Sequence, residues 1–319
     1  MAITNFVAPE NIVYKGKEAN EIMSKPIYES DLYSYGITYR PGVKGKEQLI
    51  VGEVSELFQA YTCAFTPNGE VSLAEQWIEP FNFKINLQEC YDKFWPSFMA
   101  EETRRAYVGE SNIPRTFFEW FFNDRLIKEM NKEYQEIFWQ GDTAYAGSAK
   151  PYLKVIDGIE KIISANGETI TGSAFTVDNI EAQVEAVANK ILELGSTNDM
   201  DTDNYKIFMN KHDIRLLIVA LGKDCSCNTV NNVFKNYAME GDKLYVYGFE
   251  VVPTEQSKNT IIGAPAANLV LGFDTFDSHL EYRLLDMREH TGDNSFRVIA
   301  LSNIAAGVVF PEIAVISKP

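Results

Sequence analysis

Segment 113–142 constrains the fold more than any other part of the chain, because it predicts one long amphipathic helix. Thr116 and Glu119 have the spacing of a capping box and Gly141 is a stop signal, so we expect a helix over residues 117–139. At 1.5 Å per residue this helix would be roughly 34 Å long, which exceeds most helices of globular domains. On its own it fits an ordinary α+β protein.

The two faces of this helix differ in chemistry. Its apolar face carries Trp120, Ile127, Met130, Tyr134, Ile137 and Phe138. Its charged face carries Arg125, Lys128, Glu129, Lys132, Glu133 and Glu136, with Arg125–Glu129 and Lys132–Glu136 at i,i+4 spacing. The first turn is aromatic in several directions, with Phe117, Phe118, Phe121 and Phe122. We therefore expect this end of the helix to be buried from more than one side.

The composition limits the classes of function. A net charge of −16 over 319 residues argues against a protein whose main task is to grip nucleic acid phosphates. No segment has the length or character of a signal peptide or a membrane span. Four cysteines in a chain of this size do not form a disulfide framework, which favours synthesis in a reducing cytoplasm: Cys63, Cys90, Cys225 and Cys227.

Residues 41–95 are predicted to form a long β-hairpin. Leu57, Gln59, Tyr61, Cys63 and Phe65 share one face of a predicted strand, and the turn signal 66–69 (Thr-Pro-Asn-Gly) follows. Residues 81–88 then alternate without error. The apolar face of this strand, which needs cover, consists of Phe81, Phe83, Ile85 and Leu87. Whether the cover comes from the same chain or another is left open by the pattern.

A second α+β unit is predicted from Thr176 onward. We expect a helix from about 180 to 194 ended by Gly195, a strand over 205–210, and a helix over 211–221 closed by Gly222. Strand-like segments follow, and the chain ends in a pair of long strands joined near residues 291–294.

No motif in the chain points to catalysis, a cofactor or a metal. Cys225-x-Cys227 has the wrong spacing for a redox or zinc site, and the three histidines are separated in sequence. Asp199-x-Asp201-x-Asp203 resembles the start of a calcium loop but lacks its glycine and its final glutamate.

One basic loop leaves two interpretations open. It contains Arg40, Lys44 and Lys46, and it is either an ordinary exposed loop or a surface that touches phosphate or an acidic protein.

The order of the elements resembles the major capsid protein of tailed bacteriophages, the Hong Kong 97 capsid fold. The segments that carry this resemblance are EIFWQGD (136–142), DGIEKII (157–163), IFMNKHDIRLL (207–217), YGFEVVPTEQ (247–256), NLVLGFD (268–274) and SFRVIALSNIAAGVVFPEIAVI (295–316). Each segment taken alone is only weakly similar to the family, and the resemblance lies in the order of the segments along nearly the whole chain.

The resemblance implies an α+β Hong Kong 97-like fold with four parts. Residues 1–40 would be the N-terminal arm and 41–95 the extended hairpin, or E-loop. Residues 96–175 and 276–308 would form the peripheral (P) domain with the long spine helix. Residues 176–275 and 309–319 would form the axial (A) domain.

The resemblance also implies a structural, non-enzymatic protein of the virion, made in the host bacterial cytoplasm. It would self-assemble into hexameric and pentameric capsomers of an icosahedral shell around double-stranded DNA. Scaffolding, portal and head-decoration proteins are further candidate partners, the packaged DNA would be contacted weakly and non-specifically, and no membrane is involved. Since only about 40 residues precede the hairpin, scaffolding would be a separate protein or unnecessary.

Two alternatives remain at this point: an encapsulin-like nanocompartment shell, and a soluble enzyme with an unrecognised site. No residue is a candidate for catalysis, metal binding or cofactor binding. The candidates for a subunit interface are Phe81, Phe83, Ile85, Leu87, Phe118 and Phe122. A charge at Phe83 is predicted to leave the subunit folded and to block assembly.

Overall fold

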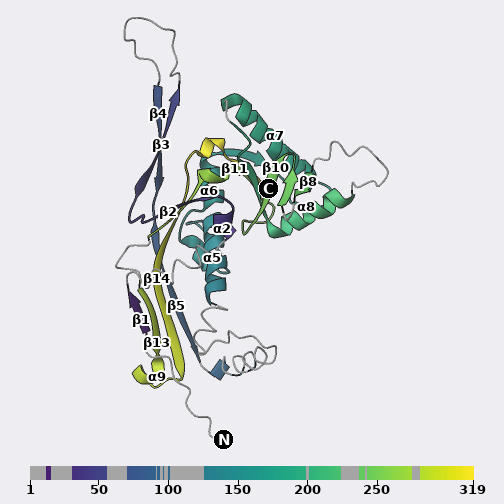
Figure 1. The fold of residues 1–319 in the computed structure, drawn as a ribbon. Coiled ribbons are helices and arrows are strands. Elements are labelled where there is room, and N and C mark those ends of the chain that lie inside the picture. The colour runs from purple at the N-terminus through teal and green to yellow at the C-terminus, as the bar shows by residue number, and fades with distance from the viewer. Residues whose placement is uncertain are drawn as a thin grey trace, which may run out of the picture. The chain divides into compact units, whose positions relative to one another are not determined.

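The computed structural model describes residues 12–15, 31–55, 70–90, 92, 93, 96, 100, 126–198, 201–223, 237–240, 243–274 and 281–319 (Figure 1). The chain divides into two compact units, each built from separate stretches of sequence. The first comprises Met1–Asp31, Phe81–Tyr134 and Phe273–Ile304, and the second comprises Leu32–Pro80, Gln135–Gly272 and Ala305–Pro319. Among the helices of the described ranges, none combines the length and the apolar character needed to span a bilayer.

Strand β14 (Ser295–Val308) organises the sheet of the first unit. Antiparallel β13 (Glu281–Asp286) and β5 (Phe81–Cys90) both pair with its first part, and β1 (Ile12–Lys15) extends the sheet beyond β13. The short helix α9 (Met287–His290) connects β13 to β14, and Asp286 caps it by accepting a hydrogen bond from the backbone N–H of Arg288. The predicted pairing of the two C-terminal strands is confirmed, but β13 has only 6 residues, and the second strand ends at Val308 and does not continue to the C-terminus.

The strand pairing corrects one sequence interpretation. The alternation predicts residues 81–88 as a strand of the hairpin, but β5 pairs with β14 over its whole length. The hairpin consists instead of β3 (Glu47–Ser55) and β4 (Glu70–Ile78). Alternation of apolar and polar residues marks any half-buried strand and does not identify the strand that pairs with it. Pro80 lies between β4 and β5, and because proline has no backbone N–H it cannot donate a hydrogen bond that would continue the ladder. The predicted strand and turn over 57–69 lie outside the described residues.

Helix α5 (Ile127–Gln140) is the described part of the predicted long helix. The helix ends as predicted, since the N–H of Gly141 donates to the Ile137 carbonyl at 3.0 Å. The apolar face is also confirmed, and its described members are all buried: Ile127, Met130, Tyr134, Ile137 and Phe138. Residues 117–125, with the aromatic first turn, lie outside the described residues.

One member of the predicted charged face of α5 is not on the surface. Glu136 is 5% exposed, accepts a hydrogen bond from the hydroxyl of Tyr152, and lies 3.0 Å from Lys150 Nζ. Lys132 forms an ion pair with Glu129 at 3.4 Å. The i,i+4 pattern missed this arrangement because the partners of Glu136 come from the segment after the helix.

The second unit contains a seven-stranded sheet of order β6-β15-β11-β7-β10-β9-β8. Its strands are β6 (Glu168–Thr171), β7 (Tyr205–Asn210), β8 (Tyr237–Glu240), β9 (Lys243–Val246), β10 (Phe249–Thr254), β11 (Ile261–Pro265) and β15 (Val315–Lys318). The pairs β7–β10 and β6–β15 are parallel and the others antiparallel. Tyr247 and Gly248, at φ 51° and 87°, form the tight turn between β9 and β10.

Helices cover this sheet from both sides. On one side α7 (Ile180–Asn198) and α8 (Lys211–Lys223) pack on a core that includes Ile207 and Met209 of β7. On the other side the ring of Phe208 lies 5.2 Å from that of Trp139 at the end of α5. Because the centre of β7 is buried on both faces, its residues 207–209 (Ile-Phe-Met) are apolar without alternation.

Both helices run further than predicted. Helix α7 continues through Gly195 to Asn198, and α8 through Gly222 to Lys223. A glycine inside a helix costs only about 1 kcal/mol relative to alanine, so it need not end a helix that is packed on a sheet.

The base of the hairpin is anchored by a small core. Leu49 of β3 and Ile78 of β4 pack with Val43, Val270 and Ala305. These belong to the loop after β2 (Thr38–Pro41), to β12 (Leu269–Phe273) and to the last part of β14. The remaining elements are α2 (Asp31–Ser34), α6 (Ile159–Asn166) and the 3-10 helices Pro151–Lys154, Ala266–Asn268 and Pro311–Ile313.

We predict that Gly141→Ala destabilises the protein. An added Cβ would lie 2.5 Å from the Ile156 carbonyl oxygen and 2.6 Å from that of Ile137, so backbone must shift. The expected loss is more than about 2 kcal/mol of unfolding free energy, measured by chemical denaturation. Gly222→Ala is the matched control, because an added Cβ there meets nothing within 4 Å, and its effect should stay within about 1 kcal/mol. Equal effects of the two substitutions would contradict the packing argument.

Candidate assembly interface

Strand β5 presents the four described candidates for a subunit interface on one face. Phe81 is 45% exposed, whereas Phe83, Ile85 and Leu87 are half-buried. The ring of Phe83 contacts that of Tyr134 edge-to-face at 5.5 Å. Phe83 therefore contributes to the packing of its own unit, and Phe81 is the most exposed apolar side chain of the strand. The other two candidates, Phe118 and Phe122, lie outside the described residues.

A second exposed aromatic side chain lies at the base of the hairpin. Trp77 of β4 is 50% exposed, and Lys46 Nζ lies 5.0 Å from the centre of its indole ring. Lys46 belongs to the basic loop noted in the sequence, in which Arg40 forms an ion pair with Glu47 at 3.3 Å and Lys44 is exposed. Val43 of the same loop is buried, whereas Lys44 and Lys46 are exposed.

Helices α7 and α8 also expose large apolar side chains. Leu192 lies on α7, and Ile218 and Val219 are neighbours on α8. Scattered exposed apolar residues are normal on a protein surface. We assign them no role by themselves.

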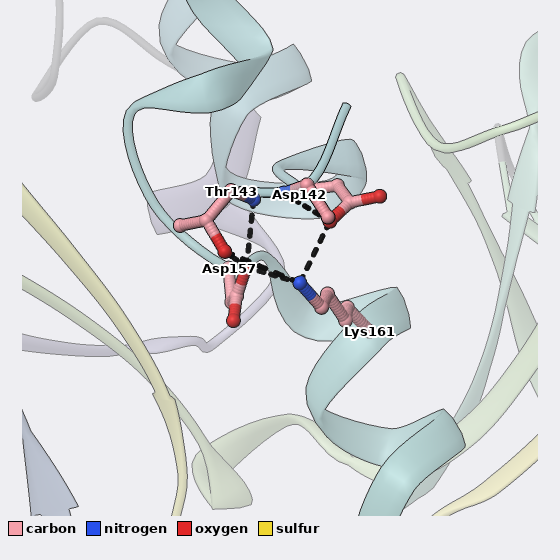
Figure 2. A network of polar contacts seen from close by, with 5 residues as sticks. Asp142, Thr143, Asp157 and Lys161 are labelled. Carbon is pink, nitrogen blue, oxygen red and sulfur yellow. Dashed lines mark hydrogen bonds and ion pairs between the residues drawn. The ribbon is translucent and has the colours of Figure 1, made fainter. Parts of the chain in front are cut away.

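A polar cluster joins the end of α5 to the start of α6 (Figure 2). Lys161 Nζ lies 2.7 Å from a carboxylate oxygen of Asp142 and 2.8 Å from one of Asp157. The backbone N–H and the hydroxyl of Thr143 both donate to the same Asp157 oxygen, at 2.8 and 2.7 Å. We call these four residues the clasp, because they hold together the two ends of segment 142–157.

The clasp shifts the protonation equilibria of its members. Hydrogen bonding from Lys161 lowers the pKa of Asp142. For Asp157, partial burial raises the pKa, but the hydrogen bonds from Lys161 and Thr143 outweigh this and lower it overall. Hydrogen bonds to both carboxylates raise the pKa of Lys161. All three groups are therefore charged at neutral pH.

No direct signal in the sequence marks the clasp, although two of the segments that carry the capsid resemblance contain three of its four residues. Asp142 ends EIFWQGD, and Asp157 and Lys161 belong to DGIEKII. The backbone brings these segments together: Gly158 N–H donates to the Gly141 carbonyl at 2.8 Å. A Cβ at Gly158 would lie 2.6 Å from Gly141 N, so this approach requires glycine.

A cavity of about 320 Å³ lies beside the clasp. Gln140, Glu160, Lys161, Ser257 and Lys318 are among the residues that line it. Burial raises the pKa of Glu160, whose carboxylate accepts a hydrogen bond from Ser257 N–H at 2.5 Å. These polar contacts connect α6 with the loop after β10.

The described residues form no cluster that could hold a metal ion. Asp201 accepts a hydrogen bond from the backbone of Asp203 at 2.9 Å in an exposed loop, and Asp199 lies outside the described residues. The side chain of His212 is exposed. The backbone N–H of His212 donates to the side-chain oxygen Oδ1 of Asn210, which caps the N-terminus of α8. Cys90 is a free, exposed thiol, and the other three cysteines lie outside the described residues.

Solved structures of phage capsids share the fold of this chain. A chain of the satellite phage P4 procapsid, which includes the size determination protein Sid, is 10% identical over 99% of this chain and 93% of that chain, with a TM-score of 0.61. A capsid chain of an empty GTA particle is 13% identical over 91% and 89% of the two chains, with a TM-score of 0.54. A chain of the capsid of cyanophage P-SCSP1u is 12% identical over 100% of this chain and 91% of that chain, with a TM-score of 0.50.

No family model matches the sequence, and no curated protein matches it. The α+β, Hong Kong 97-like fold expected from the sequence is confirmed by the structural comparisons.

The clasp predicts a specific pH dependence of stability. Its carboxylates contribute stability above their unfolded pKa values, and this contribution is lost as the pH falls through their lowered folded values. The contribution of Lys161 is complete below its unfolded pKa and is lost as the pH rises through its raised folded value. Lys161→Met should therefore lower the midpoint of chemical denaturation at pH 7 and have much less effect at about pH 2, below the usual pKa of aspartate.

Lys154→Met provides the control, because Lys154 is an exposed lysine of the same segment. Its effect should be small at both pH values. If Lys161→Met lowers the midpoint equally at pH 7 and pH 2, the clasp is not an ionic network.

Proposed function

We propose that this chain is the major capsid protein of a tailed phage, which self-assembles into an icosahedral head shell around double-stranded DNA. One observation carries the proposal: the similarity to a phage procapsid chain spans 99% of this chain and 93% of that one, so no substantial part of either fold is left over. At 10% identity the sequences alone would not support it.

The hairpin supports a role in assembly. Strands β3 and β4 pair only with each other among the described residues. A two-stranded hairpin is at best marginally stable in water, so one of this length gains from contact with another surface. Its base is held by a core within its own unit, and we propose that its distal part binds a neighbouring subunit.

Exposed aromatic side chains support the same role. Phe81 and Trp77 present large apolar surfaces to solvent in the isolated subunit, and aromatic residues are enriched in protein–protein interfaces. The net charge of −16 suits a container that encloses DNA without binding it tightly.

The finer assignments belong to the same proposal. Residues 1–40 would be the arm and 41–80, which contain the β3–β4 hairpin, the E-loop. Residues 81–175 with 276–308, which include the β5–β14 pair, would be the P-domain, and 176–275 with 309–319 the A-domain. The subunits would form hexamers and pentamers within the virion after synthesis in the host cytoplasm. The role would be structural and not catalytic, and scaffolding, portal and decoration proteins would be further partners.

The direct test is negative-stain electron microscopy of the purified chain, with analytical ultracentrifugation. Closed shells or capsomers are expected. A stable monomer under all conditions of salt and concentration would contradict the proposal, and shells filled with a single enzyme would favour a cellular nanocompartment.

We further predict that Phe81→Asp reduces assembly while the subunit stays folded. The ring is largely exposed in the subunit, so the charge costs little there, but at an interface it would be desolvated. Shell yield should fall by roughly tenfold or more, since 1.4 kcal/mol already changes an equilibrium tenfold. Asn82→Asp adds the same charge to the next position of β5, on the opposite face of the strand, and should assemble normally. Normal shells from Phe81→Asp would remove this residue from the interface.

Phe83→Asp is a weaker test than the sequence suggested. Its ring packs against Tyr134 within the unit, so the substitution should also lower the stability of the subunit. Circular dichroism melts of both phenylalanine variants separate loss of folding from loss of assembly.

A further inference from the structure

Helix α8 presents one continuous exposed stripe. Its members follow one another at intervals of three and four residues, so they point to the same side of the helix. They are His212, Arg215, Ile218, Val219 and Gly222, and all five are exposed. The two apolar side chains at its centre, Ile218 and Val219, are 47% and 54% exposed. We call this surface the α8 stripe.

The apolar pair of the α8 stripe gains little in the isolated subunit. Isoleucine and valine are branched at Cβ, which restricts their side chains in a helix and lowers their helix propensity. Burial offsets this cost on the opposite face of α8, where Leu217 and Leu221 pack in the core under the helix, but not on the stripe. Gly222 continues the stripe without a side chain, and an added Cβ there would meet nothing within 4 Å. Another helix can therefore approach this end of α8 closely.

Helix α7, which contacts α8, presents a second exposed stripe of different chemistry. Small or polar residues surround one leucine, and two carboxylates are among them. The exposed members are Ala182, Glu185, Asn189, Leu192, Glu193 and Ser196. The side chain of Leu192 is 51% exposed. We call this surface the α7 stripe.

The two stripes carry opposite charges. The permanent charge of the α8 stripe is the exposed guanidinium of Arg215. On the α7 stripe, Glu185 lies 3.5 Å from the hydroxyl of Tyr247, and Glu193 lies 3.2 Å from Lys190 Nζ. Exposed contacts of this kind are weak, so both carboxylates remain able to accept a further partner. The α7 stripe can therefore offer acceptors to an arginine and an apolar contact to the pair on α8.

These features select a second copy of the same chain as the occupant. Two α8 stripes facing each other would join their apolar side chains but would give neither arginine a carboxylate, because this stripe contains no acidic residue. Two α7 stripes would bring four carboxylates together. Only α8 against α7 matches both the charged and the apolar groups. Such a contact joins different patches of two copies, and its repetition about an axis closes a ring.

We propose that the α8 stripe of one subunit packs against the α7 stripe of the next, and that Arg215 sets the direction of this contact by pairing with Glu185 and Glu193. The inference deepens the proposed function and rests on it, because rings of one chain require a head-to-tail contact. It concerns a surface separate from β5 and from the β3–β4 hairpin.

The test combines charge reversal with sedimentation velocity over a concentration series and with counts of shells by electron microscopy. Arg215→Glu should weaken association roughly tenfold or more, because it sets like charges against each other. Adding Glu185→Arg and Glu193→Arg to the same chain should restore most of the association, since opposite charges then face each other again. Loss without restoration would overturn the proposed pairing, and unchanged association of Arg215→Glu would overturn the contact itself.

Val219→Asp tests the apolar part of the contact. The side chain is more than half exposed in the subunit, so the fold should be retained, whereas a carboxylate desolvated against Leu192 should weaken association roughly tenfold or more. Circular dichroism melts of each variant show whether the subunit is folded. Normal association of a folded Val219→Asp chain would remove this residue from the contact and overturn the proposal.

Lys154→Glu is the matched control for charge. It changes the net charge by the same amount as Arg215→Glu, at an exposed position outside both helices, and it should associate normally. An equal loss in this variant would show an effect of net charge only and would overturn the proposal.

The outcomes for shells separate this inference from the proposed function. If Arg215→Glu and Val219→Asp form shells as the unmodified chain does, the contact between the stripes is wrong and the capsid function stands. If the unmodified chain forms small rings but never shells, and Arg215→Glu abolishes the rings, the capsid function fails and the contact stands.

Discussion

The backbone pairing of β14 is the constraint on which the first unit depends. This strand has β5 and β13 as partners, and they lie about two hundred residues apart in sequence. Its last residues continue into the second unit, where they pair with β12 near the base of the hairpin. The chain of β14 thus links the pairing with β5 to the small core at the base of the hairpin and then to the C-terminal segment. Because β5 and β14 are far apart in sequence, they can pair only after most of the chain has been made.

The period-two alternation of this sheet also separates two kinds of chemistry. One side presents phenylalanines that pack on α5 or remain exposed at Phe81, and the other presents lysine, arginine and amide groups. A shift of one residue in the β5–β14 register would exchange these sides and bury Lys84. The positions of the apolar and the polar side chains of β5 are therefore fixed by the same backbone hydrogen bonds.

Local sequence signals predicted what depends on neighbours along the chain. The end of α5 at Gly141, its buried stripe and the apolar alternation of β5 are all present in the structure. The failures involve distant partners. Glu136 is buried because Tyr152 and Lys150 reach it, and β5 leaves the hairpin because β14 offers it a full-length partner.

The clasp is the clearest case of a feature that sequence could not supply. Asp142, Asp157 and Lys161 have no spacing that marks them as a group, and only the close approach of Gly141 and Gly158 brings them together. The order of segments along the chain was more informative than any single motif, because an order of elements persists in a fold when identity has fallen to about one residue in ten.

The most direct measurement is an electron cryomicroscopy reconstruction of the particles formed by the purified chain. Icosahedral symmetry is expected, with hexamers and pentamers of one subunit and with the β3–β4 hairpin of each subunit lying on its neighbour. Particles without closed symmetry, or subunits whose hairpins make no contact with a neighbouring copy, would contradict it.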